Sequence, residues 1–240
     1  MDFFAYQPTP ATWLALVAGL LSIGLSALLI LIRHQPYERV AYFVVRDLTQ
    51  VFGLGFAFPI WFVSRYMHQP LGVIGITWSR WPDAVLVDVV LAVMLALVVA
   101  KDHRDGKLHF HAGDVLYLFV TGIFEVVFFY GFLRHYFEMA FGIVPSILLA
   151  SVFYSLHHIG FEVQMRGNPW VKELSKLTAV GVLYAAVYRI AGGALAIYPL
   201  FWGVGAGSDV LLTKEGGDFP WRNAMVVLLL MMAAIGILVR

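Results

Sequence analysis

Apolar runs of about 20 residues recur along almost the whole chain, and they limit its fold more than any other feature of the sequence. They are bounded by charged or Gly/Pro-rich segments and fall roughly at 11–32, 43–64, 83–100, 113–134, 140–160, 174–190, 192–212 and 223–239. The runs lack the alternation of a membrane β-barrel, and an open sheet edge cannot be satisfied in lipid. The sequence therefore predicts an all-α, polytopic membrane protein with about eight transmembrane helices in one bundle.

The composition agrees with a chain that lies largely in lipid, so membrane lipid is the first expected partner. Of the 240 residues, 61% are hydrophobic and 13% are charged, against about 25% charged in a soluble domain. A net charge of +1 gives no basic field for nucleic acid, and the lack of cysteine excludes disulfides and thiolate catalysis. No long linker or repeat divides the sequence, so residues 1–240 are expected to form a single transmembrane domain.

Lys and Arg are unevenly distributed between the predicted connections, which predicts an orientation in the membrane. The first, third, fifth and seventh connections hold Arg33, Arg39, Lys101, Arg104, Lys107, Arg166, Lys172, Lys214 and Arg222. The alternate connections hold Arg65, Arg80, Arg134 and Arg189. Because cytoplasmic loops are enriched in Lys and Arg, we expect a multi-pass protein of the cell membrane with both termini outside the cytoplasm. The first run is longer than a signal-peptide core and is expected to be a retained span.

Ionisable side chains inside the apolar runs are the candidates for function, because each costs about 3 kcal/mol or more at mid-span. They are Asp47, Asp88, Glu125, Arg134, His157, His158, Arg189 and Asp209. Asp47, Asp88 and Arg189 lie near predicted span ends or have no motif around them. Structural pairing or snorkelling to the interface is the expected explanation for these three.

Glu125 is the only carboxylate between Tyr117 and Leu133. A carboxyl group in apolar surroundings can exchange a proton near neutral pH, as a general base that activates water requires. His157 lies in the next run, and an antiparallel hairpin would bring its helical face against Glu125, whereas His158 points about 100° away. The alternatives are a glutamic acid hydrogen-bonded to a neighbouring helix and histidines satisfied by backbone at a helix end.

Two further polar segments have alternative interpretations. Asp209 ends a Gly-rich stretch in which helices can pack closely, and it is either a span-end residue facing water or a third member of a polar cluster. The segment 101–114 contains His103, His109 and His111 but no carboxylate–His spacing typical of a zinc site. We therefore interpret it as a solvated charged loop.

The half of the chain at about 113–212 resembles the CAAX-protease and bacteriocin-processing (CPBP, or Abi) family of intramembrane proteases. That family has a Glu-Glu-xxx-Arg motif followed by Gly, then Phe-xxx-His on the next helix, then His-xxx-Asn/Asp nearer the C-terminus. Glu125 and Gly131 match the first motif, and Phe153 and His157 match the second. Eight spans also agree with the architecture of the family.

The chain departs from the family pattern at three positions. Val126 stands in the place of the second Glu, Tyr130 in the place of the Arg, and Gly205 in the place of the third-motif His. Asp209 occupies the Asn/Asp place of that motif. Arg134 does not replace the lost Arg, because it lies about 180° round the helix from the motif glutamate.

The resemblance implies roles for individual residues. The family's first Glu and its Phe-xxx-His histidine are held to activate water, and its third-motif residues to bind metal or stabilise the oxyanion. Glu125 would then be the base, His157 its partner and Tyr130 a donor of one hydrogen bond. A divalent metal such as zinc would take Glu125, His157 and Asp209 as ligands, with one position open.

The expected function is accordingly an intramembrane endopeptidase, a metalloprotease if it holds the metal, that hydrolyses a peptide bond of a membrane-associated or lipidated substrate. Two other functions stay open. One is a catalytically inactive relative that acts as a membrane scaffold, chaperone or peptide-binding protein. The other is a small transporter in which Glu125, His157 and Asp209 relay protons or bind a cation.

Overall fold

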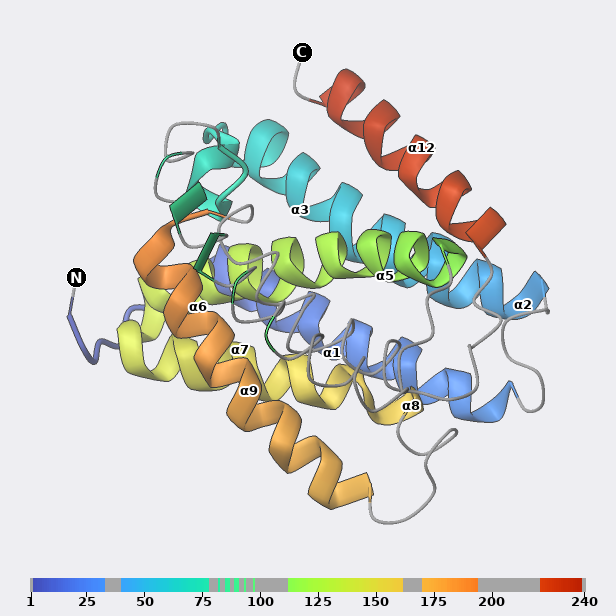
Figure 1. Ribbon diagram of the computed structural model, residues 1–240. Helices are drawn as coiled ribbons and strands as arrows, with labels where there is room; N and C mark the ends of the chain where they lie inside the picture. The colour runs from blue at the N-terminus through green and yellow to red at the C-terminus, as the bar shows by residue number, and fades with distance from the viewer. Residues whose placement is uncertain are drawn as a thin grey trace.

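The regular secondary structure of the described residues is helical, without a strand. The computed structural model describes residues 2–32, 40–77, 82, 85–86, 89–90, 93, 97, 112–161, 170–193 and 221–238 (Figure 1). The all-α prediction is confirmed for this part of the chain. Most of the predicted span at 83–100, and nearly all of that at 192–212, lies outside it.

Four of the described helices are long and apolar enough to cross a membrane. They are α1 (Pro10–Leu31), the continuous helix Val40–Tyr66, α9 (Trp170–Ala191) and α12 (Trp221–Leu238). The second consists of α2 (Val40–Tyr42), η1 (Phe43–Ala57), α3 (Phe58–Trp61) and η2 (Phe62–Tyr66). Each coincides with a run predicted from the sequence, and together they indicate a membrane protein.

A second continuous helix begins at residue 112 and forms a tight hairpin with the helix that follows it. Its parts are α5 (Ala112–Glu125), η4 (Val126–Leu133) and α6 (Arg134–Phe141), followed by α7 (Ile143–His157) and α8 (Ile159–Phe161). The turn between α6 and α7 is Gly142, with φ 88° and ψ −179°. Only glycine adopts this conformation readily, which explains the sharp reversal at this residue.

The N-terminal segment (residues 2–9) lies against this turn. Four backbone hydrogen bonds of 2.7 to 3.2 Å join them: Ala5 N–H to Phe141 O, Gln7 N–H to Ala140 O, Ile143 N–H to Asp2 O and Val144 N–H to Phe3 O. The last carbonyls of a helix and the first N–H groups of the next have no partner within their own helices. The N-terminal segment therefore satisfies groups at both ends of the turn.

The hairpin lies at the centre of the bundle. α7 packs against α6 and α9, α12 against α5 and η1, and α1 against η1, α7 and α8 (Figure 1). The core is rich in fully buried aromatic rings, which are those of Phe62, Phe124, Phe128, Phe129, Phe132, Phe137, Tyr130, Tyr136, Tyr184 and Tyr188. A short 3₁₀ turn, η3 (Leu71–Ile74), packs on η4.

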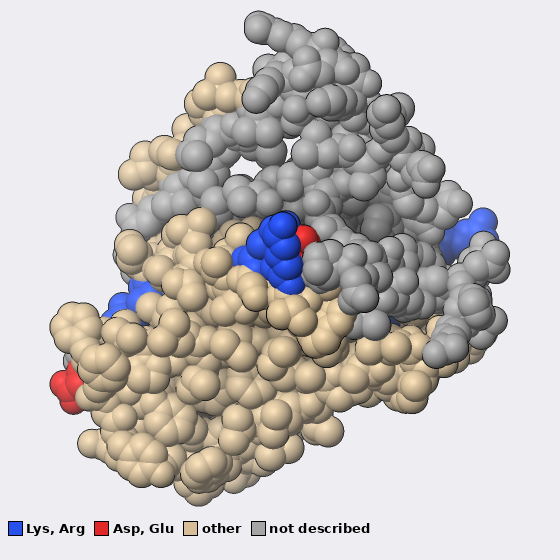
Figure 2. All heavy atoms as spheres, turned by 90° about the horizontal axis from the view of Figure 1, so that it is seen from below, with Lys and Arg blue, Asp and Glu red and all other residues tan. Residues whose placement is uncertain are grey.

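The outer surface of the described helices is apolar as well. On α1 alone, Trp13, Val17, Leu20, Leu21 and Leu31 are each at least half exposed. Figure 2 shows one face of the molecule on which nearly all the described atoms belong to uncharged residues. Large apolar side chains on the outside are expected of helices that face lipid, where no hydrophobic force drives them inward.

Candidate active site

Glu125, which is buried, and His158, which is partly exposed, form a carboxyl–imidazole pair between the two helices of the hairpin. Glu125 is the last residue of α5, and His158 directly follows α7. The His158 Nε2 lies 3.9 Å from the Glu125 Oε2, with side-chain exposures of 19% and 9%. The hairpin thus brings together one residue of the first family motif and the neighbour of the second-motif histidine.

The proton position on His158 follows from its other ring nitrogen. The Nδ1 of His158 lies 2.9 Å from the carbonyl oxygen of Tyr154. A carbonyl oxygen only accepts, so Nδ1 carries a hydrogen and the neutral ring has its lone pair on Nε2. This lone pair and Glu125 are 3.9 Å apart, which is too far for a direct hydrogen bond. One water molecule at about 2.8 Å from each atom can bridge them.

His157, the predicted partner of Glu125, makes its polar contacts elsewhere. Its Nδ1 lies 3.0 Å from the Ser22 Oγ and 3.0 Å from the Gln50 Nε2. Its ring packs on Phe124 and Phe129, with centroids 5.2 Å apart in both cases. Because consecutive helical residues point about 100° apart, turning His158 toward α5 turns His157 toward α1 and η1.

Three buried polar residues of the N-terminal half hold this part of α7, and the sequence interpretation did not select them. Ser22, Ser26 and Gln50 are each at most 3% exposed. The Ser26 Oγ donates to the carbonyl of His157 and accepts from the backbone N–H of Gly160. The sequence does contain a signal for these residues, because Ser22 and Ser26 are four residues apart and so form a polar face on an otherwise apolar helix. A glutamine inside an apolar run is also costly without a partner.

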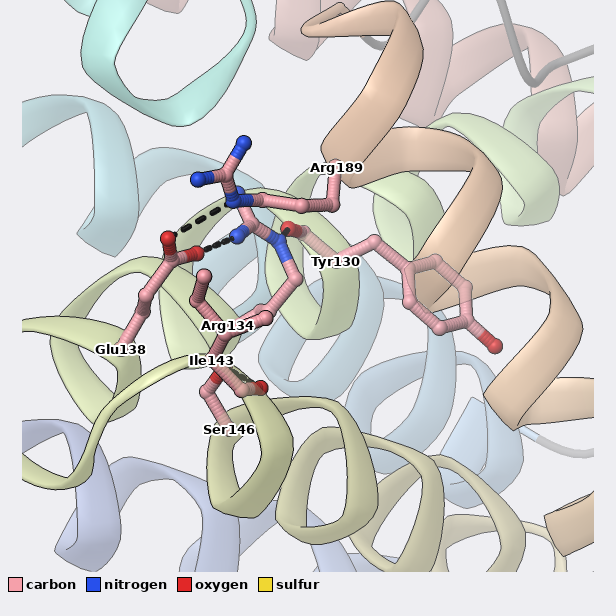
Figure 3. Close-up of polar contacts among 6 residues, drawn as sticks. All are labelled: Tyr130, Arg134, Glu138, Ile143, Ser146 and Arg189. Atoms are coloured by element: carbon pink, nitrogen blue, oxygen red, sulfur yellow. Dashed lines mark hydrogen bonds and ion pairs between the residues drawn. The ribbon is translucent and has the colours of Figure 1, made fainter. Parts of the chain in front are cut away.

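Tyr130 is fully buried on η4 and packs among other tyrosine rings. Its ring centroid lies 5.5 Å from that of Tyr154 and 5.9 Å from that of Tyr184. Its backbone carbonyl accepts a hydrogen bond of 2.9 Å from the Nε of Arg134. Figure 3 shows the Tyr130 ring directed away from the ion pairs of Arg134. The side chain that replaces the family's Arg therefore belongs to the aromatic core.

Arg134 and Glu138, which are buried, and Arg189, which is partly exposed, form a cluster that we call the arginine–glutamate cluster (Figure 3). One carboxylate oxygen of Glu138 pairs with Arg134, and the other lies 2.7 Å from the Arg189 Nε. The Arg134 guanidinium also lies over the Tyr188 ring, 5.3 Å from its centroid. The structural pairing predicted for Arg189 is confirmed. The sequence did not identify Glu138 as the partner of Arg189, because Glu138 lies between the runs predicted at 113–134 and 140–160, whereas the structure places it in α6.

Asp47 is also held by structural partners, as predicted. Its Oδ1 lies 3.0 Å from the Arg46 NH1, and its Oδ2 accepts a hydrogen bond of 3.2 Å from the Asn223 side chain. The Arg46 guanidinium lies over the Tyr117 ring, 4.9 Å from its centroid. These contacts join η1 to α5 and α12. Asp88 and Asp209, together with the histidines of the segment 101–111, lie outside the described residues.

The metal site expected from the resemblance can be tested only on two of its three ligands. Within the described ranges, no three His, Asp or Glu side chains are placed to hold a metal ion. Asp209 falls outside these ranges. The Nδ1 of His157 is within hydrogen-bonding distance of the Gln50 amide nitrogen, a donor, and of the Ser22 hydroxyl. No step of the reaction below uses a metal.

Comparison with known proteins assigns no family to the chain. No protein-family model, curated protein or solved structure matches it. The resemblance to the CPBP family stays a prediction from the sequence, whose motif residues in the hairpin are Glu125, Gly131, Phe153 and His157.

Proposed function

We propose that this protein is an intramembrane endopeptidase that hydrolyses a peptide bond of a membrane-associated or lipidated substrate. The observation that carries the proposal is the 3.9 Å separation between the Glu125 Oε2 and the His158 Nε2. A carboxylate oxygen and an imidazole lone pair at this distance can both accept from one water molecule between them, inside a bundle whose helices are long enough to span a bilayer. Such a water is the nucleophile that peptide hydrolysis requires.

Each group has a defined role in the proposed reaction. The water donates one hydrogen bond to Glu125 and one to the lone pair of His158, which directs a lone pair of its oxygen at the carbonyl carbon. The ionised Glu125 takes one water proton as the O–C bond forms. It then gives this proton to the amine nitrogen as the C–N bond breaks, which returns it to the carboxylate. The second water hydrogen stays on the new carboxyl group.

The surroundings of the pair favour this chemistry. Phe124 directly precedes Glu125, Phe129 lies one helical turn after it, and both are fully buried, while Glu125 itself is 7% exposed. Electrostatic interactions are stronger in such apolar surroundings than in water. We place the pair in a bundle of about eight spans in the cell membrane, with both termini outside the cytoplasm, as the Lys and Arg distribution indicates.

The test compares newly formed protein termini in membranes of cells that express wild type or a variant at equal levels. Glu125→Gln removes the base while keeping the shape of the side chain, and His158→Gln removes the lone pair on Nε2. Glu173→Gln is the matched control, because Glu173 lies at the start of α9 and pairs with Lys176, 2.7 Å away. We expect the same cleavage products to disappear in both site variants and to persist in the control.

The loss is expected to reach at least about 10²-fold, as for removal of a general base. Identical termini in wild type and both site variants, with the proteins folded, would overturn the proposal. The scaffold or peptide-binding function would then be the better account. Gated uptake of a cation that depends on Glu125 would instead identify the transporter.

A further inference from the structure

The amide of Gln50 makes two contacts that fix the direction of its hydrogen bonds. Its nitrogen, Nε2, lies 2.7 Å from the backbone carbonyl oxygen of Ser22 and 3.0 Å from the Nδ1 of His157. A carbonyl oxygen accepts only, so the atom facing Ser22 must be the amide nitrogen rather than the amide oxygen. One N–H of Gln50 is directed at Ser22, which leaves the second for His157.

The proton position on His157 follows from this second N–H. An Nδ1 that faces an amide donor is an acceptor, so the neutral ring carries its hydrogen on Nε2. The hydroxyl of Ser22, at 3.0 Å, can donate to the same Nδ1. Gln50 is 1% exposed, Ser22 0% and His157 6%. Buried polar groups of this kind are costly unless they are paired, so the arrangement is strongly favoured over a rotated amide.

We propose that Gln50 is a positioning residue that holds His157 as its Nε2–H tautomer, so that His157 acts as a hydrogen-bond donor. The neighbouring His158 has the opposite tautomer, with its hydrogen on the Nδ1 that contacts Tyr154. The two rings lie perpendicular, with centroids 5.3 Å apart. One imidazole therefore offers an N–H and the other a lone pair in the same part of the bundle.

The roles of His157 as donor and His158 as acceptor in the reaction rest on the proposed function. When water adds to a peptide carbonyl, negative charge develops on the carbonyl oxygen and needs a donor. The Nε2–H of His157 is such a donor, whereas the deprotonated Nε2 of the other tautomer would repel the oxyanion. Tyr130, which the resemblance makes a donor of one hydrogen bond, is packed among the tyrosine rings of the core.

The decisive measurement is the ¹⁵N spectrum of the histidine rings in the full-length protein, labelled with ¹⁵N-histidine and held in lipid nanodiscs. Signals of His157 are identified by their loss in His157→Gln. We expect a protonated Nε2 and an unprotonated Nδ1 in wild type. A protonated Nδ1 in wild type would overturn the proposal without any variant having to fold.

Two variants then test whether Gln50 is the cause. Gln50→Met keeps the length of the side chain and removes the donor, so the Nδ1–H tautomer should gain population. Gln50→Glu replaces the donor by an acceptor, so an ionised side chain should move the hydrogen to Nδ1. Ser151→Ala is the control, since Ser151 is buried on α7 but bonds only the Ile147 carbonyl. An unchanged tautomer in a folded Gln50→Met would contradict the role of Gln50.

A cleavage assay on the same proteins separates this inference from the proposed function. We expect Gln50→Met to lower kcat in proportion to the population that leaves the Nε2–H tautomer, with KM nearly unchanged, because an oxyanion donor acts in the transition state. If wild type cleaves nothing but shows the expected ¹⁵N signals, the endopeptidase proposal is wrong, and the proposal that Gln50 positions His157 is retained. If wild type cleaves but carries the hydrogen of His157 on Nδ1, the endopeptidase proposal is retained and the proposed role of Gln50 is wrong.

Discussion

Gly131 lies where η4 packs against Ile74 of η3. A Cβ atom at this position would meet the carbonyl oxygen of Ile74 and lie 3.1 Å from the Tyr188 hydroxyl. That hydroxyl donates to the same Ile74 carbonyl, so a methyl group would also disturb a buried hydrogen bond between α9 and η3. We expect Gly131→Ala to lower the free energy of unfolding by about 1–3 kcal/mol.

Gly24 provides the matched comparison in α1. A Cβ atom there would have nothing within 4 Å, so Gly24→Ala should stabilise the helix by about 0.5–1 kcal/mol. Thermal unfolding of the purified protein in detergent measures both variants against wild type. A Gly131→Ala protein as stable as Gly24→Ala would mean that the contact with Ile74 is not formed.

At the residue scale, the sequence predicted Glu125 as the central carboxylate and His157 as its partner, whereas the structure places the Nε2 of His158 nearest to it. His157 and His158 are adjacent and differ by about 100° in direction, so a small roll of α7 decides between them. The roll is set by Ser22 and Gln50, which lie far away in sequence. The sequence next to the two histidines does not indicate these contacts.

The arginine–glutamate cluster joins two helices and predicts unequal effects for its members. Glu138→Gln would leave Arg134 buried without its counter-charge, and we expect a loss of about 3 kcal/mol in the free energy of unfolding. Arg189→Gln should cost about 1 kcal/mol or less, because the Arg189 side chain is 36% exposed. Denaturation of both purified variants with SDS measures the difference. Equal losses would show that Arg134 does not depend on Glu138.

At the element scale, four apolar runs correspond closely to the four candidate membrane-spanning helices, because about 20 apolar residues suit a span and little else. The end of the run predicted at 113–134 was less predictable. Its helix continues past 134 to Phe141, since Arg134 and Glu138 pair inside the bundle instead of facing water. Charged residues mark a span end only while they remain unpaired.

The orientation of the whole molecule can be tested because the chain has no cysteine. A single cysteine introduced by Tyr6→Cys lies in the N-terminal segment, where Tyr6 is 78% exposed. In intact cells it should react with a membrane-impermeant maleimide, whereas Glu38→Cys in the first predicted connection should react only after permeabilisation. The reverse pattern would place the termini in the cytoplasm.

The contact between the N-terminal segment and the α6–α7 turn limits how many times the chain can cross the membrane between them. Two points of a chain on the same side of a bilayer are separated by an even number of crossings. α1 and the helix Val40–Tyr66 are two candidate crossings between them. The helix of α5, η4 and α6 lies in the run predicted at 113–134 and would be a third. We therefore expect a fourth crossing between Tyr66 and Ala112, and the apolar run predicted at 83–100 is the candidate for it.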